Sequence, residues 1–87
     1  MRILLVEDDP ALRRSLAATF REEGYAVDTA GDGEEGLAKS NGGVYDAVVL
    51  DVMLPLMNGW EVLERMRPDN RVPVLMLTAR DTVPDRV

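Results

Sequence analysis

Short apolar runs alternate with amphipathic stretches along this chain. The first and third runs are continuous and apolar, a pattern typical of strands buried on both faces. Strands are expected over residues 3–6, 25–30, 47–50 and 72–77. Because proline cannot donate to a sheet ladder, Pro73 is expected at the start or the edge of the fourth strand.

A helix is expected after the first strand. Pro10 suits its first position and Asp9 the N-cap before it. Its apolar positions recur at helical spacing: Leu12, Leu16 and Phe20. Gly24 is expected to end it, since glycine adopts the left-handed conformation of a helix C-terminus.

Two more helices begin with capping-box signals. Asp32 with Glu35 starts one that ends near residues 41–43, and Asn58 with Glu61 starts the next. Their inward faces carry Leu37, Ala38, Val62, Leu63 and Met66. A further helix, capped by Asp81 or Thr82, is expected beyond the fourth strand.

Strands that alternate with helices through short connections predict a parallel sheet with helices on both faces. In open sheets of this type, ligands bind at the carboxyl ends of the strands. The residues that follow the apolar runs are therefore the candidates for chemistry, namely Glu7, Asp8, Asp9, Asp51 and Thr78.

The amino-acid composition excludes several kinds of site and partner. With neither Cys nor His among the 87 residues, the chain has no thiolate zinc site and no Ser-His-Asp triad. A net charge of −6 disfavours direct binding to nucleic acid. No apolar run spans a bilayer and the first residues lack a signal-peptide pattern, so a cytoplasmic protein without membrane contact is expected.

If the first and third strands are neighbours, their terminal acids converge. Packed carboxylates repel, and a divalent cation with oxygen ligands would neutralise them, which favours Mg²⁺. Capping explains Asp9 without any ligand. For Asp51, a ligand or nucleophile role and a loop role remain open, and Thr78 alone reads as a strand-end hydroxyl bonded to its own backbone.

Three strings of the sequence carry a family resemblance. They are I-L-L-V-E-D-D-P at residues 3–10, D-V-M-L-P-L-M-N-G at 51–59 and V-L-M-L-T-A-R-D at 74–81. The chain resembles the receiver domain of bacterial two-component response regulators, most closely the OmpR/PhoB-like group. The resemblance implies an α/β, flavodoxin-like (CheY-like) fold whose four strands lie in the order 2-1-3-4.

The resemblance also implies a site. Asp51 would be the phosphoacceptor, in a reaction that depends on Mg²⁺. Asp8 and Asp51 would bind the metal directly, Glu7 through water, and Met53 through its backbone carbonyl.

Two further residues would complete the switch. Thr78 would supply the switch hydroxyl, and the small Ala79 would leave room for the phosphoryl group. A sensor histidine kinase would be the phosphodonor, and a winged-helix DNA-binding domain of the parent protein would carry the response to transcription.

Against the family pattern, residues 1–87 correspond to the N-terminal portion of a receiver domain. The fourth helix would be incomplete, and the fifth strand, with its lysine, and the fifth helix would be absent. The single lysine, Lys39, is expected on a solvated helix face and would not replace that lysine. The isolated chain is therefore expected to be phosphorylated poorly.

The sequence favours a signalling module that is not an enzyme, and it leaves two alternatives. One alternative is an assembly fragment that dimerises through an exposed fourth strand, with one face of strands one and three bared by the missing helix. A magnesium-dependent aspartyl-phosphate hydrolase is disfavoured, because such enzymes place a second acid where this chain has Met53.

Overall fold

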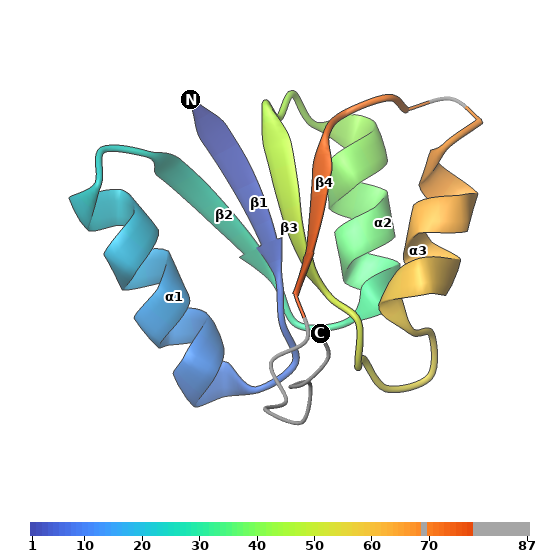
Figure 1. Ribbon diagram of the computed structural model, residues 1–87, viewed down its shortest axis with the longest axis horizontal. Helices are drawn as coiled ribbons and strands as arrows, with labels where there is room; N and C mark the ends of the chain where they lie inside the picture. The colour runs from blue at the N-terminus through green and yellow to red at the C-terminus, as the bar shows by residue number, and fades with distance from the viewer. Residues whose placement is uncertain (69, 78–87) are drawn as a thin grey trace, which may run out of the picture.

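The computed structural model describes residues 1–68 and 70–77 (Figure 1). Strands and helices alternate from the N-terminus: β1 (Arg2–Val6), α1 (Pro10–Glu22), β2 (Ala26–Ala30), α2 (Gly33–Gly42), β3 (Ala47–Asp51), α3 (Gly59–Met66) and β4 (Val74–Leu77). Every strand and helix expected up to residue 77 is confirmed. β4 begins directly after Pro73, as the chemistry of proline requires. The helix expected near Asp81 lies outside the described residues.

The four strands form one parallel sheet in the order β2-β1-β3-β4, which confirms the expected topology. Helix α1 covers one face, while α2 and α3 lie side by side on the other (Figure 1). This is the flavodoxin-like arrangement, in which β1 and β3 are central. Among the described residues, no helix has the length and apolar character needed to cross a membrane.

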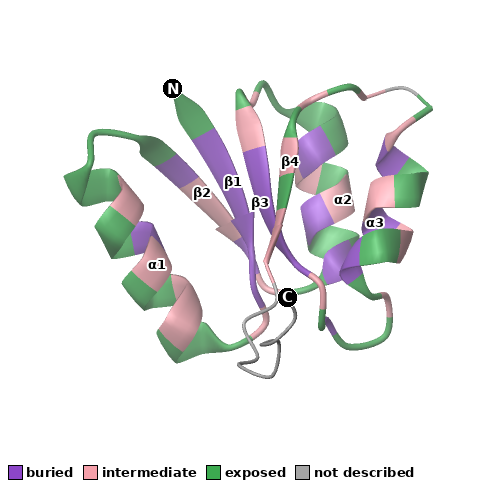
Figure 2. Cartoon of the chain, viewed as in Figure 1, coloured by how far each residue is buried: buried purple, intermediate pink, exposed green. Residues whose placement is uncertain are grey.

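The core has two parts because alternate residues of β1 and β3 point to opposite faces. Figure 2 shows that β1 and β3 are buried along most of their length. Under α2 and α3 lie Leu4, Val6, Ala30, Val48, Leu50, Leu54, Val62 and Met66. Under α1 lie Ile3, Leu5, Ala17, Val27 and Val49. Burial on both faces is the reason that β1 and β3 read as continuous apolar runs.

The expectation that one face of β1 and β3 is bared is wrong. Ile3, Leu5 and Val49 are only 5%, 1% and 4% exposed. Their cover includes Leu16 and Phe20 of α1 and Leu77 of β4, which pack against them. The large apolar side chain that is exposed on the sheet is Leu75 of β4, at 58%.

Side-chain caps begin each helix where the sequence predicts. Asp9 accepts from the backbone N–H groups of Ala11 and Leu12, at 3.0 and 3.3 Å. Asp32 and Asn58 each accept from the backbone N–H three residues on, at 2.8 and 2.9 Å. These contacts satisfy donors that a helix N-terminus otherwise leaves free.

Candidate carboxylate and metal site

Three carboxylates meet where β1 and β3 end. Val6 pairs with Leu50 in the parallel register, so Glu7 and Asp51 emerge from neighbouring strands at the same edge of the sheet. One carboxylate oxygen from each of Glu7, Asp8 and Asp51 lies within 4.8 Å of the others. The predicted convergence of the acids is thus confirmed for these three residues.

Asp51 is buried, with 1% of its surface exposed. Its Oδ1 accepts a hydrogen bond of 3.0 Å from the backbone N–H of Met53. Its Oδ2 has no partner among the described residues, although it too is buried. Such an atom loses its hydration without compensation, and this is where a cation or a new covalent partner would be most favourable.

Glu7 is also buried, at 2% exposure, and hydrogen bonds hold both its backbone and its carboxylate. Its N–H donates to the Ala30 carbonyl at 3.1 Å, and its Oε2 accepts from the Asp9 N–H at 3.1 Å. Burial, together with the nearby carboxylates of Asp51 and Asp8, raises the pKa of Glu7 above its ordinary value. Negative charge is therefore disfavoured in this cluster unless a cation balances it.

The donor set fits a hard divalent cation. Within residues 1–68 and 70–77 it consists of oxygen atoms, with a buried Asp51 oxygen that has no partner in these ranges and a half-buried carboxylate on Asp8. Mg²⁺ prefers this chemistry and retains several waters, which the less buried Asp8 side would admit. The role of the Met53 carbonyl as a ligand stays a prediction.

The structure brings together only part of the predicted site. Glu7, Asp8, Asp51 and the backbone of Met53 share the end of the sheet. Asp9 caps α1, which agrees with its capping interpretation. Thr78 and Ala79 lie outside the described residues.

The loop after β3 is tightly held, and this fixes the approach to Asp51. The Val52 N–H donates to the Leu77 carbonyl at 2.9 Å, and the Val52 carbonyl accepts from the Gly59 N–H, also at 2.9 Å. Further along, the Met57 N–H donates to the Pro55 carbonyl at 2.6 Å across Leu56, whose φ of 66° is unusual for a residue other than glycine. The loop thus returns the chain to the end of β3 before α3 begins.

Arg13 supports the site and was missed by sequence reasoning. Its Nη1 donates to the Glu7 carbonyl at 2.8 Å, which ties α1 to the end of β1. The signal for it was present, because Arg13 lies three and four residues before Leu16 and Ala17 on the helix face that meets the sheet.

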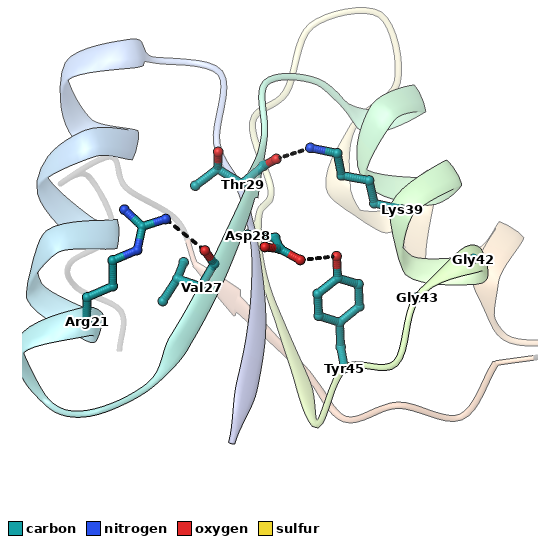
Figure 3. Close-up of a pocket in the computed structure, with 8 residues that line it drawn as sticks. All are labelled: Arg21, Val27, Asp28, Thr29, Lys39, Gly42, Gly43 and Tyr45. Carbon is teal, nitrogen blue, oxygen red and sulfur yellow. Dashed lines mark hydrogen bonds between the residues drawn. The ribbon is translucent and has the colours of Figure 1, made fainter.

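A second polar region lies along β2, which forms one edge of the four-stranded sheet. An open pocket of about 590 Å³ is lined there by Arg21, Val27, Asp28, Thr29, Lys39, Gly42, Gly43 and Tyr45 (Figure 3). Arg21 of α1 donates to the Val27 carbonyl at 2.8 Å, and Lys39 of α2 donates to the Thr29 carbonyl at 2.6 Å. Both carbonyls face away from β1. Successive carbonyls along a strand point to opposite sides, and the carbonyl of Ala30, the next residue, points toward β1 and accepts from the Glu7 N–H.

These contacts correct the expectation for Lys39. Its side chain is half-buried and bound to β2, and it also pairs with Glu35 at 3.1 Å, so it is not simply solvated. The reason is the position of α2, which lies beside β2 and within reach of its outer edge.

A hydrogen-bonded pair closes the other side of this pocket. The Tyr45 hydroxyl donates to Asp28 at 2.7 Å, and the Arg2 guanidinium lies 3.4 Å from the same carboxylate. The Tyr45 bond, followed by the charge of Arg2, holds the pKa of Asp28 below its ordinary value. Burial and the Asp28 carboxylate raise the pKa of Tyr45.

Comparison with protein families gives a match to the response regulator receiver domain over residues 3–87. The chain is 53% identical to the transcriptional regulatory protein TcrA of Mycobacterium tuberculosis over 88 residues, and 49% identical to the transcriptional activator protein IrlR of Burkholderia pseudomallei over 87. Both matches cover 100% of this chain. The chain spans only 35% and 38% of the length of these relatives.

Solved structures agree with the sequence matches. The response regulator TrrA of Thermotoga maritima, determined in complex with Mg²⁺-BeF, superposes with a TM-score of 0.86 at 42% identity, covering 92% of this chain and 70% of that one. The chemotaxis protein CheY4 of Vibrio cholerae superposes with a TM-score of 0.82 at 35% identity, covering 94% and 71%.

Proposed function

Since the chain belongs to the family of response regulator receiver domains, we propose that it is a phosphoacceptor module whose nucleophile is Asp51. The observation that carries the proposal is the buried Oδ2 of Asp51, which has no hydrogen-bond partner in the part of the chain that the structure describes and lies beside the carboxylates of Glu7 and Asp8. A structural aspartate would be stabilised by partners for both oxygens. This one keeps an oxygen available for reaction.

The reaction is phosphoryl transfer to a carboxylate. An oxygen of Asp51 attacks the phosphorus of a phosphorylated histidine on a sensor kinase; the new O–P bond forms as the P–N bond breaks, and the imidazole leaves with the electron pair. The Met53 N–H on Oδ1 orients the carboxylate, so that Oδ2 is the attacking atom. The product is an acyl phosphate on Asp51.

Glu7, Asp8, Asp51 and the Met53 carbonyl would hold Mg²⁺. When bound, the ion neutralises the carboxylates and the phosphoryl oxygens, which otherwise repel one another. Calorimetry should detect Mg²⁺ binding to the wild-type chain, and Asp8→Ala and Asp51→Ala should each weaken it. Equal affinity in all three proteins would overturn the metal assignment.

The response to phosphorylation belongs to the parent protein. Thr78 would bond a phosphoryl oxygen and Ala79 would leave room for the group. The resulting population shift would reach a DNA-binding effector domain through dimerisation. We place this protein in the cytoplasm, where its kinase would present the phosphorylated histidine.

These 87 residues are proposed to react slowly by themselves. Their single lysine, Lys39, is bound to Thr29 at the edge of β2, and so it does not lie with the carboxylates. Positive groups that meet the charge of a transferring phosphoryl group are worth several kcal/mol, on the order of 3 in oxyanion sites. Phosphorylation of the chain should therefore be slower than that of a receiver extended through the fifth strand.

Intact-mass measurement after incubation with acetyl phosphate and Mg²⁺ tests the function. We expect slow phosphorylation of the 87-residue chain, faster phosphorylation of an extended receiver, and no product in either when Asp51 is changed to Asn. Asp32→Asn, which preserves an exposed helix cap, is the matched control and should react normally. Undiminished labelling of the Asp51→Asn variant would refute the proposed nucleophile.

Self-association through β4 is a second candidate function. Leu75 is exposed on an edge strand, which favours association with a second copy of the chain. A hydrolase is not favoured, because the position two residues after Asp51 holds Met53 rather than a general acid. A stable dimer that acetyl phosphate never labels would favour the assembly role over the switch.

A further inference from the structure

We infer that Gly59 is a positioning residue for Asp51: because it lacks a side chain, the first turn of α3 packs directly on the end of β3 that carries the carboxylate. The inference deepens the proposed function and rests on it for the consequence in phosphoryl transfer. The positioning itself is a matter of backbone geometry.

A Cβ atom at position 59 would have no room. It would lie 2.6 Å from the Asp51 carbonyl oxygen, 2.9 Å from the Val52 Cα and 3.0 Å from the Met76 Cε. Met76 ends in a flexible thioether, which can rotate away. The other two atoms belong to the backbone of the nucleophile and its neighbour, so relief requires that α3 or the end of β3 move.

Gly59 is also bonded to the same segment. Its N–H donates to the Val52 carbonyl at 2.9 Å, and the Val52 N–H in turn donates to Leu77 of β4. Asn58 caps α3 directly before Gly59, through the Glu61 N–H. The start of α3 and the end of β3 therefore form one connected unit, and a displacement at position 59 reaches Asp51 without passing through a flexible linker.

The hydrogen bond from Met53 to Asp51 lies within this unit. Its acceptor oxygen and its donor N–H belong to residues on either side of Val52. A shift of Val52 changes the distance and angle of this bond, and with it the direction of the free Oδ2. Phosphoryl transfer depends on that direction, since a misplacement of about 1 Å can cost about 100-fold in rate.

Other glycines of the chain provide controls. A Cβ at Gly36 would meet only side-chain atoms of Val6, whereas a Cβ at Gly42 would meet nothing within 4 Å, and Gly42 has no positive φ. Gly42→Ala is thus the silent control for an added methyl group in a helix. Val27→Ala, in the core under α1 and on β2, is the control for lost stability remote from the site.

The test uses the 87-residue chain and two readouts. The first is the Met53 amide resonance in the metal-free protein, which reports its bond to Asp51. The second is Mg²⁺ affinity from amide-shift titration. We expect Gly59→Ala to shift the Met53 resonance and to weaken Mg²⁺ binding by about ten-fold. Gly42→Ala and Val27→Ala should keep both near wild-type values.

A double variant provides a second test in case Gly59→Ala alone does not fold. Gly59→Ala combined with Met76→Ala removes the flexible contact and leaves both backbone contacts, so the Met53 resonance should remain shifted. If that resonance and the Mg²⁺ affinity are wild-type in either folded variant, the inference is overturned. If the wild-type chain binds no Mg²⁺ while the Met53 resonance still shifts on Gly59→Ala, the proposed function fails and the positioning stands.

Discussion

Asp51 is bound on one side only: the Met53 N–H holds Oδ1 at 3.0 Å, and Oδ2 is buried without a partner among the described residues. The carboxylate is therefore oriented but not satisfied. Two acids, Glu7 and Asp8, approach the same oxygen-rich space. The arrangement stores unfavourable electrostatic energy in the metal-free protein, and several measurable effects depend on it.

Asp51→Asn is expected to stabilise the metal-free protein. The change removes a buried charge that repels Glu7 and Asp8 and keeps nearly the same shape. The free energy of unfolding should rise by about 1 kcal/mol, which corresponds to about 4–8 °C in the thermal midpoint of a domain of this size. Asp32→Asn, at an exposed helix cap, should leave the midpoint unchanged, and a lower midpoint for Asp51→Asn would contradict the prediction.

Added Mg²⁺ is expected to reverse this order. A ligand that binds only the folded state stabilises it by about 2.7 kcal/mol at a concentration of 100 times its dissociation constant. The wild-type midpoint should therefore rise with Mg²⁺ concentration, while that of Asp51→Asn should rise far less. Equal midpoint shifts for the two proteins would show that Asp51 does not contribute to the metal site.

Tyr45→Phe is expected to destabilise the protein at neutral pH and much less in acid. The Tyr45 bond lowers the pKa of Asp28, so its stabilisation is present above the unfolded pKa near 3.8 and is lost as the pH falls through the lower folded pKa. The carboxylate is partly exposed, so the loss at pH 7 should be about 1 kcal/mol. Urea unfolding from pH 7 down to pH 3 gives the comparison.

Tyr25→Phe is the control for that experiment, because the exposed Tyr25 packs on Phe20 through its ring. It should have little effect at any pH. A loss on Tyr45→Phe that stays constant down to pH 3 would mean that packing, rather than the bond to Asp28, is responsible.

Leu56→Gly is expected to stabilise the protein even though glycine is the more flexible residue. Leu56 has a φ of 66° and its side chain is fully exposed, so glycine removes strain without losing contacts. Relief of about 1–2 kcal/mol should exceed the entropic cost of about 0.5–1 kcal/mol. Val44→Gly, at an exposed position without positive φ, should only destabilise; chemical denaturation distinguishes the two.

Leu75→Lys is expected to reduce self-association. Leu75 is the exposed apolar residue of β4, and a charge there opposes pairing with another strand. Sedimentation velocity across micromolar concentrations should show larger species for wild type than for the variant. Val44→Lys adds the same charge to a loop and should behave as wild type. A wild-type chain that stays monomeric throughout would refute association through β4.

Much of the fold was accessible from the sequence because its signals are local. The run from Ile3 to Val6 has to be buried on both faces, and Asp9 before Pro10 starts a helix by its own hydrogen bonds. The convergence of Glu7 and Asp51 followed once β1 and β3 were expected to be neighbours. Pattern and topology together therefore located the carboxylates.

What the sequence could not show depends on distances between elements. Lys39 reaches Thr29 only because α2 lies beside β2, and Gly59 meets Asp51 only because α3 returns to β3. Which oxygen of Asp51 is bound depends on the turn through Met53. No periodicity or composition encodes these approaches, which arise when the helices pack.

The bonds from Arg21 and Lys39 to β2 have a consequence for assembly. A sheet can pair edge to edge with other sheets only through edges whose backbone groups are free. The outward carbonyls of β2 already accept hydrogen bonds from Arg21 of α1 and Lys39 of α2. A unit with two links grows into a filament, whereas a unit with one link stops at a pair. The bonds from Arg21 and Lys39 to β2 thus disfavour a second link at that edge, and assembly through β4 alone would stop at a pair.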